Sequence, residues 1–154
     1  MTLVLTEHNI KLTCLSEPHM IETLDIDELV EDLTDGTPPV FLTPERICAQ
    51  DLIVVATLVK PGTNARAKAG AKSGAKPTRY LGLLGARDDT AGGQAFLRLD
   101  MACVAPAVRG QRLISRLLAC AAAERIGRTP ILAARTATPS WFQRWDPLRR
   151  QLIR

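Results

Sequence analysis

The chain has few of the residues on which several common active sites depend. Its 154 residues include two histidines and one tyrosine, Tyr80, and aromatic residues make up 4% of the total. The four cysteines are far apart in the sequence and form no C-x-x-C pair. We therefore expect no histidine-based catalytic centre and no metal site, and we expect buried free thiols rather than disulfides.

Long apolar runs are also missing. No apolar run approaches the ~20 residues that a membrane-spanning helix needs, and the N-terminus lacks the charged-then-apolar order of a signal peptide. We expect a cytoplasmic protein that has no membrane partner. With 46% hydrophobic residues the chain can build one core, so residues 1–154 are predicted to form a single domain.

Charge is unevenly divided along the chain. Residues 1–51 contain eleven acidic and two basic side chains, whereas residues 52–154 contain five acidic and eighteen basic ones. Such an asymmetry suits oppositely charged partners for the two halves. An anionic cofactor would fit the second half, and a cationic substrate would fit the first.

The stretch from 95 to 127 predicts a strand, a tight turn and a helix. Between residues 95 and 104 the apolar side chains at 97, 99, 101 and 103 alternate with others, as in a strand with one face in a core. Pro106 ends this strand. From Gly110 onward apolar residues recur at helical spacing, and Gly127 can end the helix as a C-terminal cap.

The turn in this stretch places a helix N-terminus among three arginines, Arg109, Arg112 and Arg116. A helix N-terminus carries unpaired N–H groups and a partial positive charge, so it can bind an anionic phosphate. The alternative is an ordinary strand–turn–helix whose arginines only face solvent.

The sequence from Val104 to Gly110, V-A-P-A-V-R-G, resembles the V-x-P-x-x-R-G that opens the acyl-CoA site of the GNAT superfamily of N-acetyltransferases. In that family the strand backbone pairs with the pantetheine arm, and the turn amides hold the pyrophosphate of coenzyme A. Residues 130–137 resemble the family's next strand, and Thr138-Pro139 stands where many members have Asn-Pro. The resemblance covers roughly residues 50–146 and implies a single GNAT-like domain.

The resemblance implies acetyl-CoA as co-substrate, with no metal. The residues that it assigns to cofactor binding are Cys103, Val104, Arg109, Gly110, Gln111, Arg112, Leu113, Ile114 and Thr138. The family's turn has glycine where this chain has Arg112, and glycine or alanine where it has Ile114. Arg112 either narrows the site or binds the phosphate through its own side chain.

The resemblance also implies direct attack of a neutral amine on the thioester, with backbone amides near Cys103 and Val104 holding the acyl oxygen. Asp100 is the nearest carboxylate on the central strand and is a candidate base. Arg98 lies two residues away on the same face, so a structural ion pair with Asp100 is the alternative. The family's tyrosine acid has no counterpart here, which leaves its role to Ser140, to water or to no group.

The remaining segments predict a mixed α/β fold. Strands are expected at 2–6, 10–15, 52–59, 79–87 and 131–136, in addition to 95–104, and helices are expected at 26–33 and 43–50. Residues 88–93 are expected to form a turn. The three middle strands would form an antiparallel meander, and the last would pair in parallel across the helix. The predicted fold class is therefore a mixed, mainly antiparallel sheet with helices on both faces, as in GNAT proteins.

Three further features leave alternatives open. The acidic positions of the 26–33 helix are either a solvated face or a patch that recruits a cationic amine acceptor. Residues 61–78 form a basic, low-complexity stretch, expected to be a flexible loop, with nucleic-acid binding as a weaker alternative. Apolar residues near the C-terminus, including Trp141 and Trp145, predict a homodimer.

The candidate functions are an N-acyltransferase, a non-catalytic acyl-CoA-binding or dimerising relative, and a nucleic-acid-associated protein.

Overall fold

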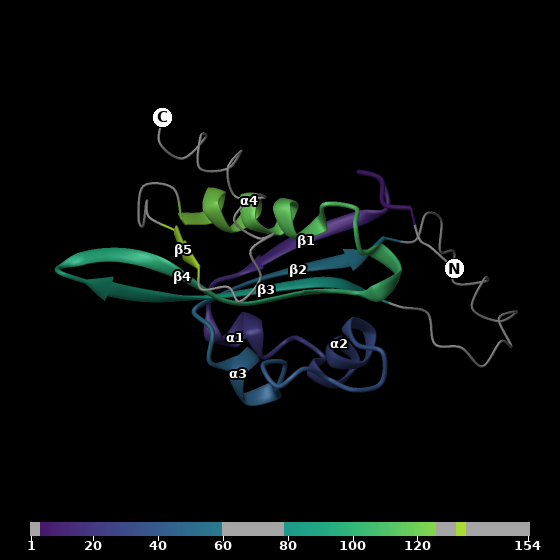
Figure 1. The fold of residues 1–154 in the computed structure, drawn as a ribbon, viewed down its shortest axis with the longest axis horizontal. Coiled ribbons are helices and arrows are strands. Elements are labelled where there is room, and N and C mark those ends of the chain that lie inside the picture. The colour runs from purple at the N-terminus through teal and green to yellow at the C-terminus, as the bar shows by residue number, and fades with distance from the viewer. Residues whose placement is uncertain (1–3, 60–78, 126–131, 135–154) are drawn as a thin grey trace, which may run out of the picture.

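A computed structural model describes residues 4–59, 79–125 and 132–134, and these residues form a five-stranded sheet with helices on both faces (Figure 1). The strands lie side by side in chain order: β1 (Ile10–Leu15), β2 (Leu52–Leu58), β3 (Tyr80–Ala91), β4 (Gln94–Val104) and β5 (Leu132–Ala134). The pairs β1–β2, β2–β3 and β3–β4 are antiparallel, and β5 is parallel to β4. The predicted meander and the predicted parallel pair are confirmed.

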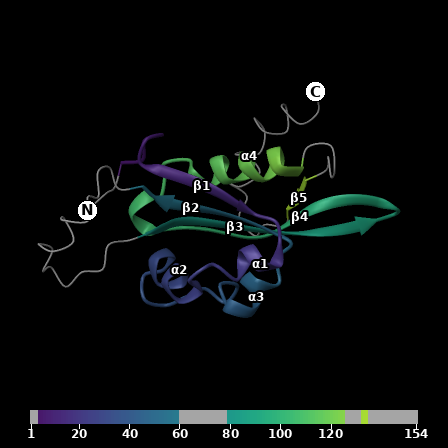
Figure 2. The ribbon, with the colours of Figure 1, turned by 180° about the vertical axis from the view of Figure 1, so that it is seen from behind.

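Three short helices cover one face of the sheet and one longer helix covers the other. These are α1 (Pro18–Ile21), α2 (Ile26–Leu33) and α3 (Pro44–Cys48) on the first face, and α4 (Leu113–Arg125) on the second. Figures 1 and 2 show the same two layers from opposite sides. The predicted fold class, a mixed and mainly antiparallel sheet with helices on both faces, is confirmed.

The predicted helix starts are confirmed by their caps. The Asp25 side chain accepts a hydrogen bond of 3.1 Å from the Glu28 N–H at the start of α2. The Thr43 hydroxyl accepts one of 3.3 Å from the Arg46 N–H at the start of α3, where Pro44 is the first helical residue. The four-residue α1 was not predicted, because one helical turn is too short to show a helical period.

Two of the expected boundaries are wrong. Residues 88–91 continue β3 instead of forming a turn, and the chain reverses at Gly92 and Gly93, whose φ values are +56° and +77°. The expected strand at 2–6 is not formed at positions 4–6, where the Leu5 N–H instead donates a hydrogen bond of 2.7 Å to the Gln111 side chain. The strands expected at 10–15, 52–59 and 95–104 and the helices expected at 26–33 and 43–50 are found within two residues of their expected ends.

The predicted placement of the apolar residues of β4 on one face is wrong, because the strand has a bulge at Asp100. Leu99 is opposite Ala86 and Met101 is opposite Gly85, so Asp100 is the extra residue between them. Neighbouring residues of β3 point to opposite faces, which places Leu99 on the α4 face and Met101 on the face of α1–α3. Both are buried because helices cover both faces.

The core therefore has two layers of side chains, one on each side of the sheet. On one side Leu113 and Leu117 of α4 pack over Gly82, where an added Cβ would lie 3.1 Å from each leucine side chain. On the other side Leu29 and Leu33 of α2 are fully buried. Close approach of α4 thus depends on the small residue in β3.

Several sequence-based expectations lie outside the described residues. They concern the basic stretch at 61–78, the helix cap at Gly127, the site residues Thr138 and Ser140, and the C-terminal apolar residues. Within 4–59, 79–125 and 132–134, no helix has the length and hydrophobicity required to cross a membrane.

Candidate functional site

The turn between β4 and α4 is held in place by a buried side chain and by backbone hydrogen bonds. After Val104, the Ala105 N–H donates to the Leu81 carbonyl of β3 over 2.9 Å. A short 3-10 helix follows at Pro106–Val108, and the Val108 side chain is buried. These contacts fix the path of the chain into α4, and the polar residues that follow stay on the surface.

Two residues of this turn have positive φ. Gly110 has φ +83° and Arg112 has φ +58°, the one non-glycine residue with positive φ among those that the structure describes. This left-handed conformation costs an L-residue roughly 1–2 kcal/mol, whereas glycine adopts it freely. Arg112 stands where the GNAT motif has glycine, so the backbone has a conformation suited to glycine although the residue differs.

The turn presents positive charge at the N-terminus of a thirteen-residue helix. Arg109 and Arg112 are exposed, Arg116 is half-buried, and the first turn of α4 contains no acidic residue. The first N–H groups of any α-helix lack partners within the helix, and its N-terminal end is partly positive. An added Cβ at Gly110 would meet no atom within 4 Å, so the turn has open space beside it. These features fit a phosphate group.

Not every residue predicted to bind the cofactor offers its side chain. The side-chain oxygen of Gln111 accepts the hydrogen bond from the Leu5 N–H, which ties the N-terminal segment to the turn. Leu113 belongs to the core, and Ile114 is partly buried against it. Gln111, Leu113 and Ile114 can therefore contribute mainly through their backbone.

Cys103, at the end of β4, connects the strand to α2. Its Sγ lies 3.6 Å from the carbonyl oxygen of Leu33 and donates a weak hydrogen bond to it. Burial raises the pKa of the Cys103 thiol, and the Arg109 guanidinium and the Val104 N–H offset part of this rise. Cys103 is thus a protonated thiol that packs against the end of α2.

The candidate base Asp100 is held by a residue that the sequence did not indicate. The Gln50 Nε2 donates hydrogen bonds to the Asp100 carboxylate over 2.9 Å and to the Arg46 carbonyl over 2.8 Å. The ion pair expected as an alternative is wrong, because Arg98 instead contacts Asp89 over 2.8 Å. No spacing rule could have identified Gln50, which follows α3 and is fifty positions from Asp100.

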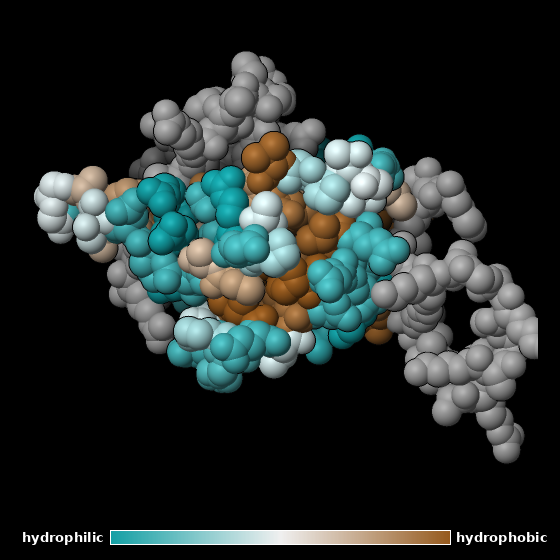
Figure 3. Space-filling model, turned by 90° about the horizontal axis from the view of Figure 1, so that it is seen from below, coloured by the Kyte–Doolittle hydropathy of each residue, from teal (hydrophilic) through white to brown (hydrophobic). Residues whose placement is uncertain are grey.

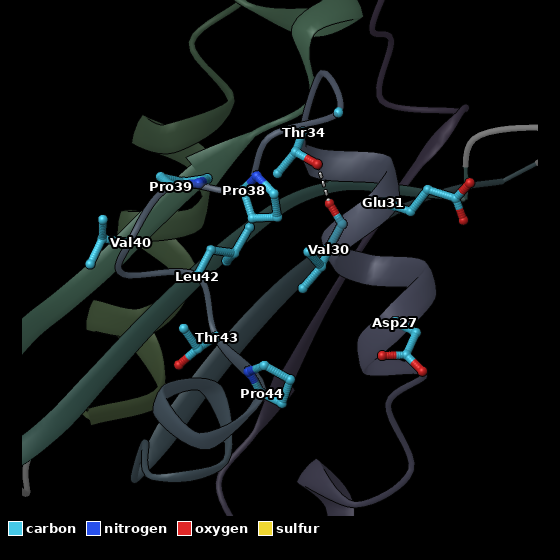
Figure 4. Close-up of a pocket in the computed structure, with 11 residues that line it drawn as sticks. Asp27, Val30, Glu31, Thr34, Pro38, Pro39, Val40, Leu42, Thr43 and Pro44 are labelled. Atoms are coloured by element: carbon cyan, nitrogen blue, oxygen red, sulfur yellow. Dashed lines mark hydrogen bonds between the residues drawn. The ribbon is translucent and has the colours of Figure 1, made fainter.

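A pocket lies between α2 and the segment that leads to α3 (Figure 4). It has a volume of about 890 Å³. Figure 4 shows α2 on one side, Pro39 and Val40 on the other, and Pro38 and Leu42 between them. From this side of the molecule, apolar residues form a band between hydrophilic flanks (Figure 3). The pocket is lined by Asp27, Val30, Glu31, Thr34, Gly36, Pro38, Pro39, Val40, Leu42, Thr43 and Pro44.

The four acidic residues of α2 fall into two pairs. The Asp32 carboxylate accepts hydrogen bonds of 2.9 Å from the N–H groups of Arg79 and Tyr80, and Glu28 lies 3.6 Å from the Arg79 guanidinium. Asp27 and Glu31 are exposed and line the pocket. The acidic helix is therefore more than a solvated face, since one pair supports the start of β3 and the other borders the pocket.

A metal centre is not visible in the described part of the chain, where no group of three or more His, Cys, Asp or Glu residues could hold an ion. The candidate functional groups of the fold are the arginine-rich turn, the Gln50–Asp100 pair and the acidic edge of the pocket.

Comparison with known proteins identifies the fold. No protein-family model matches the sequence, and no curated protein sequence matches it. Among solved structures, a Deinococcus radiodurans protein assigned to the acetyltransferases is similar with a TM-score of 0.58 and 16% identity, over 100% of this chain and 87% of that one. An acetyltransferase of Trypanosoma brucei has a TM-score of 0.55 and 18% identity, over 91% of both chains.

A third solved structure, an aminoglycoside acetyltransferase from an uncultured soil metagenomic sample, has a TM-score of 0.51 and 14% identity. The match covers 90% of each chain. At identities this low, structural similarity establishes the fold and not the reaction. The chain has a GNAT-like fold.

Proposed function

We propose that this chain is an acyl-CoA-dependent N-acyltransferase that moves an acetyl group from acetyl-CoA to an amine. The observation that carries the proposal is the turn between β4 and α4. Its positive-φ backbone at Gly110 and Arg112 and its exposed arginines would form an anion site, in a fold shared with acetyltransferases.

The turn residues would hold the pyrophosphate, with Arg109 and Arg112 supplying charge-assisted hydrogen bonds. The backbone at Cys103 and Val104 would pair with the pantetheine arm and hold the acyl oxygen. Thr138, at the start of the following segment, is proposed as a further contact by resemblance. Acetyl-CoA supplies the acetyl group as a thioester, which a neutral amine attacks directly.

Two proton transfers accompany the proposed reaction. Asp100 would accept the proton of the attacking amine, because it is a half-buried carboxylate on the strand that leads to the turn, and Gln50 holds its position. Ser140 would protonate the departing thiolate, or water would do so. A thiol has a low enough pKa to leave without an obligatory acid.

A cationic amine is the proposed class of acceptor. Asp27 and Glu31 place two carboxylates at the edge of the pocket beside α2, and Val30 and Leu42 supply apolar surface within it. The pocket lies next to the end of β4, because Cys103 contacts Leu33 one residue before the lining residue Thr34. An acceptor with a second positive charge besides the reacting amine would suit this edge.

Calorimetric titration with CoA tests the anion site. We expect binding that weakens with added salt and that falls roughly tenfold or more in Arg109→Glu, as expected for the loss of a charge-assisted contact. Arg87→Glu, at an exposed arginine of β3, is the matched control and should bind like the wild type. Equal affinities for the two variants would contradict the placement of the site.

Turnover separates the enzyme from a non-catalytic relative. Release of free CoA from acetyl-CoA in the presence of mono- and polyamines would support the acyltransferase. CoA binding without turnover on any amine would favour an acyl-CoA-binding or dimerising protein. Light scattering tests the homodimer that we also propose, and a mass of one chain at micromolar concentration would rule it out.

A further inference from the structure

Two cysteines that are 106 positions apart in the sequence meet between β1 and α4. The Cys14 Sγ lies 3.0 Å from the Cys120 Sγ and 3.9 Å from the Cys120 carbonyl oxygen. Both residues are half-buried. Cys48 is exposed at the end of α3, and Cys103 packs against α2.

The core of the protein, rather than the thiols themselves, brings these two residues together. Cys14 is opposite Val54 in the β1–β2 pairing, which places its side chain on the α4 face of the sheet. Cys120 stands beside the buried Ala121 and three residues after the buried Leu117, which packs over Gly82. The backbones of both cysteines are therefore fixed by the packing of α4 on the sheet.

We propose that Cys14 and Cys120 form a reversible intramolecular disulfide when the protein meets hydrogen peroxide. The sulfur atoms need to approach by about 1 Å to reach the bond length of a disulfide, which side-chain rotation can provide. This modification site depends on the packing of β1 and α4 and not on the proposed acyltransferase activity.

The reaction proceeds in two steps. The sulfur of one cysteine of the pair attacks one oxygen of the peroxide, the O–O bond breaks, and a sulfenic acid forms while the thiol proton leaves with the other oxygen as water. The sulfur of the other cysteine then attacks the sulfenic sulfur, the S–O bond breaks, and the hydroxyl leaves with the proton of that second thiol as a second water. The two thiols lose two electrons and the peroxide gains two.

Either thiol can make the first attack, because the disulfide depends on the 3.0 Å approach of the two sulfur atoms. Burial and the contact with Cys120 raise the pKa of Cys14, which slows attack by its sulfur. Once the sulfenic acid has formed, the sulfur of the other cysteine is its nearest thiol partner. The bond would then join α4, which starts at the arginine-rich turn, to the edge strand β1.

Peptide mapping identifies the bond directly. Trypsin cuts after lysine and arginine except before proline, which places the four cysteines in separate peptides covering 12–46, 47–66, 99–109 and 117–125. After peroxide treatment and alkylation, we expect the peptides 12–46 and 117–125 to be recovered as one cross-linked species that dithiothreitol separates. The peptides of Cys48 and Cys103 should be alkylated or oxidised singly.

Variants and thermal melting complete the test. The oxidised wild type should lose the mass of two hydrogen atoms and melt several degrees higher, because the bond closes a long loop. Cys48→Ser should behave like the wild type, and Cys120→Ser should show neither change. A wild type that keeps Cys14 and Cys120 alkylatable after peroxide treatment, or that links other cysteines, would overturn the proposal, and this holds even if a variant fails to fold.

Discussion

Gln50 and Asp100 are joined by a hydrogen bond of 2.9 Å between the Gln50 Nε2 and the Asp100 carboxylate, and Asp100 is the extra residue of the bulge in β4. Gln50 is 4% exposed, and its Oε1 has no hydrogen-bond partner among the described residues. The bulge and the buried amide together fix one carboxylate on the face of the sheet that α2 and α3 cover.

If Asp100 accepts the amine proton, Asp100→Asn should lower kcat/KM by roughly 100-fold or more, the usual contribution of a general base. The substitution keeps the size of the side chain, so the fold and the affinity for CoA should change little. The measurement is kcat/KM with acetyl-CoA and an amine, together with the Kd for CoA.

Asp89→Asn is the matched control for this substitution. It removes a carboxylate from the same sheet, one that pairs with Arg98 near the far end of the β3–β4 hairpin. The control should keep wild-type turnover. Equal losses in both variants would indicate a general effect of charge or stability and would remove Asp100 from the proton transfer.

Much of this fold could be predicted because it depends on local patterns. Helix caps at Asp25 and Thr43 and the apolar run at 52–58 each have a short-range signature, and the structure confirms them. The positive φ of Arg112 could not be predicted from residue type, because an arginine rarely adopts it. The family resemblance pointed to this position through its expected glycine.

The errors arise where distant residues decide the local structure. The bulge at Asp100 follows from pairing with β3, and it reverses the faces of the β4 residues that come after it. The Gln50–Asp100 and Cys14–Cys120 contacts join residues fifty and 106 positions apart, so no sequence spacing could reveal them. Period-2 alternation could not show the bulge, since both faces of the sheet are buried.

Gly85→Ala should destabilise the protein by about 1–3 kcal/mol, the usual cost of overpacking a core. An added Cβ at Gly85 would lie 2.7 Å from the Met101 side chain and 2.9 Å from that of Gln50. Gly82→Ala is the control, because its new Cβ would meet the flexible ends of two leucines at 3.1 Å. Urea unfolding should show the larger loss for Gly85→Ala, and the reverse order would contradict this account of the packing.

Asp32→Ala should destabilise the fold by about 2 kcal/mol, because it leaves the N–H groups of Arg79 and Tyr80 without their acceptor. Glu31→Ala, at the neighbouring exposed carboxylate of α2, should change stability by less than about 0.5 kcal/mol. Thermal melting of the two variants measures the difference. A similar effect of both substitutions would mean that the Asp32 hydrogen bonds contribute little.

The double variant Asp27→Lys with Glu31→Lys should raise KM for polyamine acceptors several-fold, since each charge contributes about 1 kcal/mol at 4 Å in water. The Kd for CoA should not change. Glu22→Lys with Glu45→Lys changes the net charge equally at exposed positions outside the pocket and serves as the control. A rise in KM of equal size in both double variants would show that net charge alone attracts the acceptor.

Arg112→Gly separates the two roles that Arg112 can have in the turn. Its φ of +58° suits glycine, so the substitution should relieve strain and raise the melting temperature or leave it unchanged. If the guanidinium binds the pyrophosphate, as we propose, CoA affinity should fall roughly tenfold through the loss of a charge-assisted contact. The two measurements are thermal melting and calorimetric titration with CoA.

Arg112→Ala is the control, because it removes the same charge and keeps the strained backbone. It should match Arg112→Gly in CoA affinity and melt at a lower temperature than Arg112→Gly. Tighter CoA binding in Arg112→Gly than in the wild type would instead show that the arginine narrows the site, and the phosphate contacts would then belong to Arg109 and the backbone of the turn.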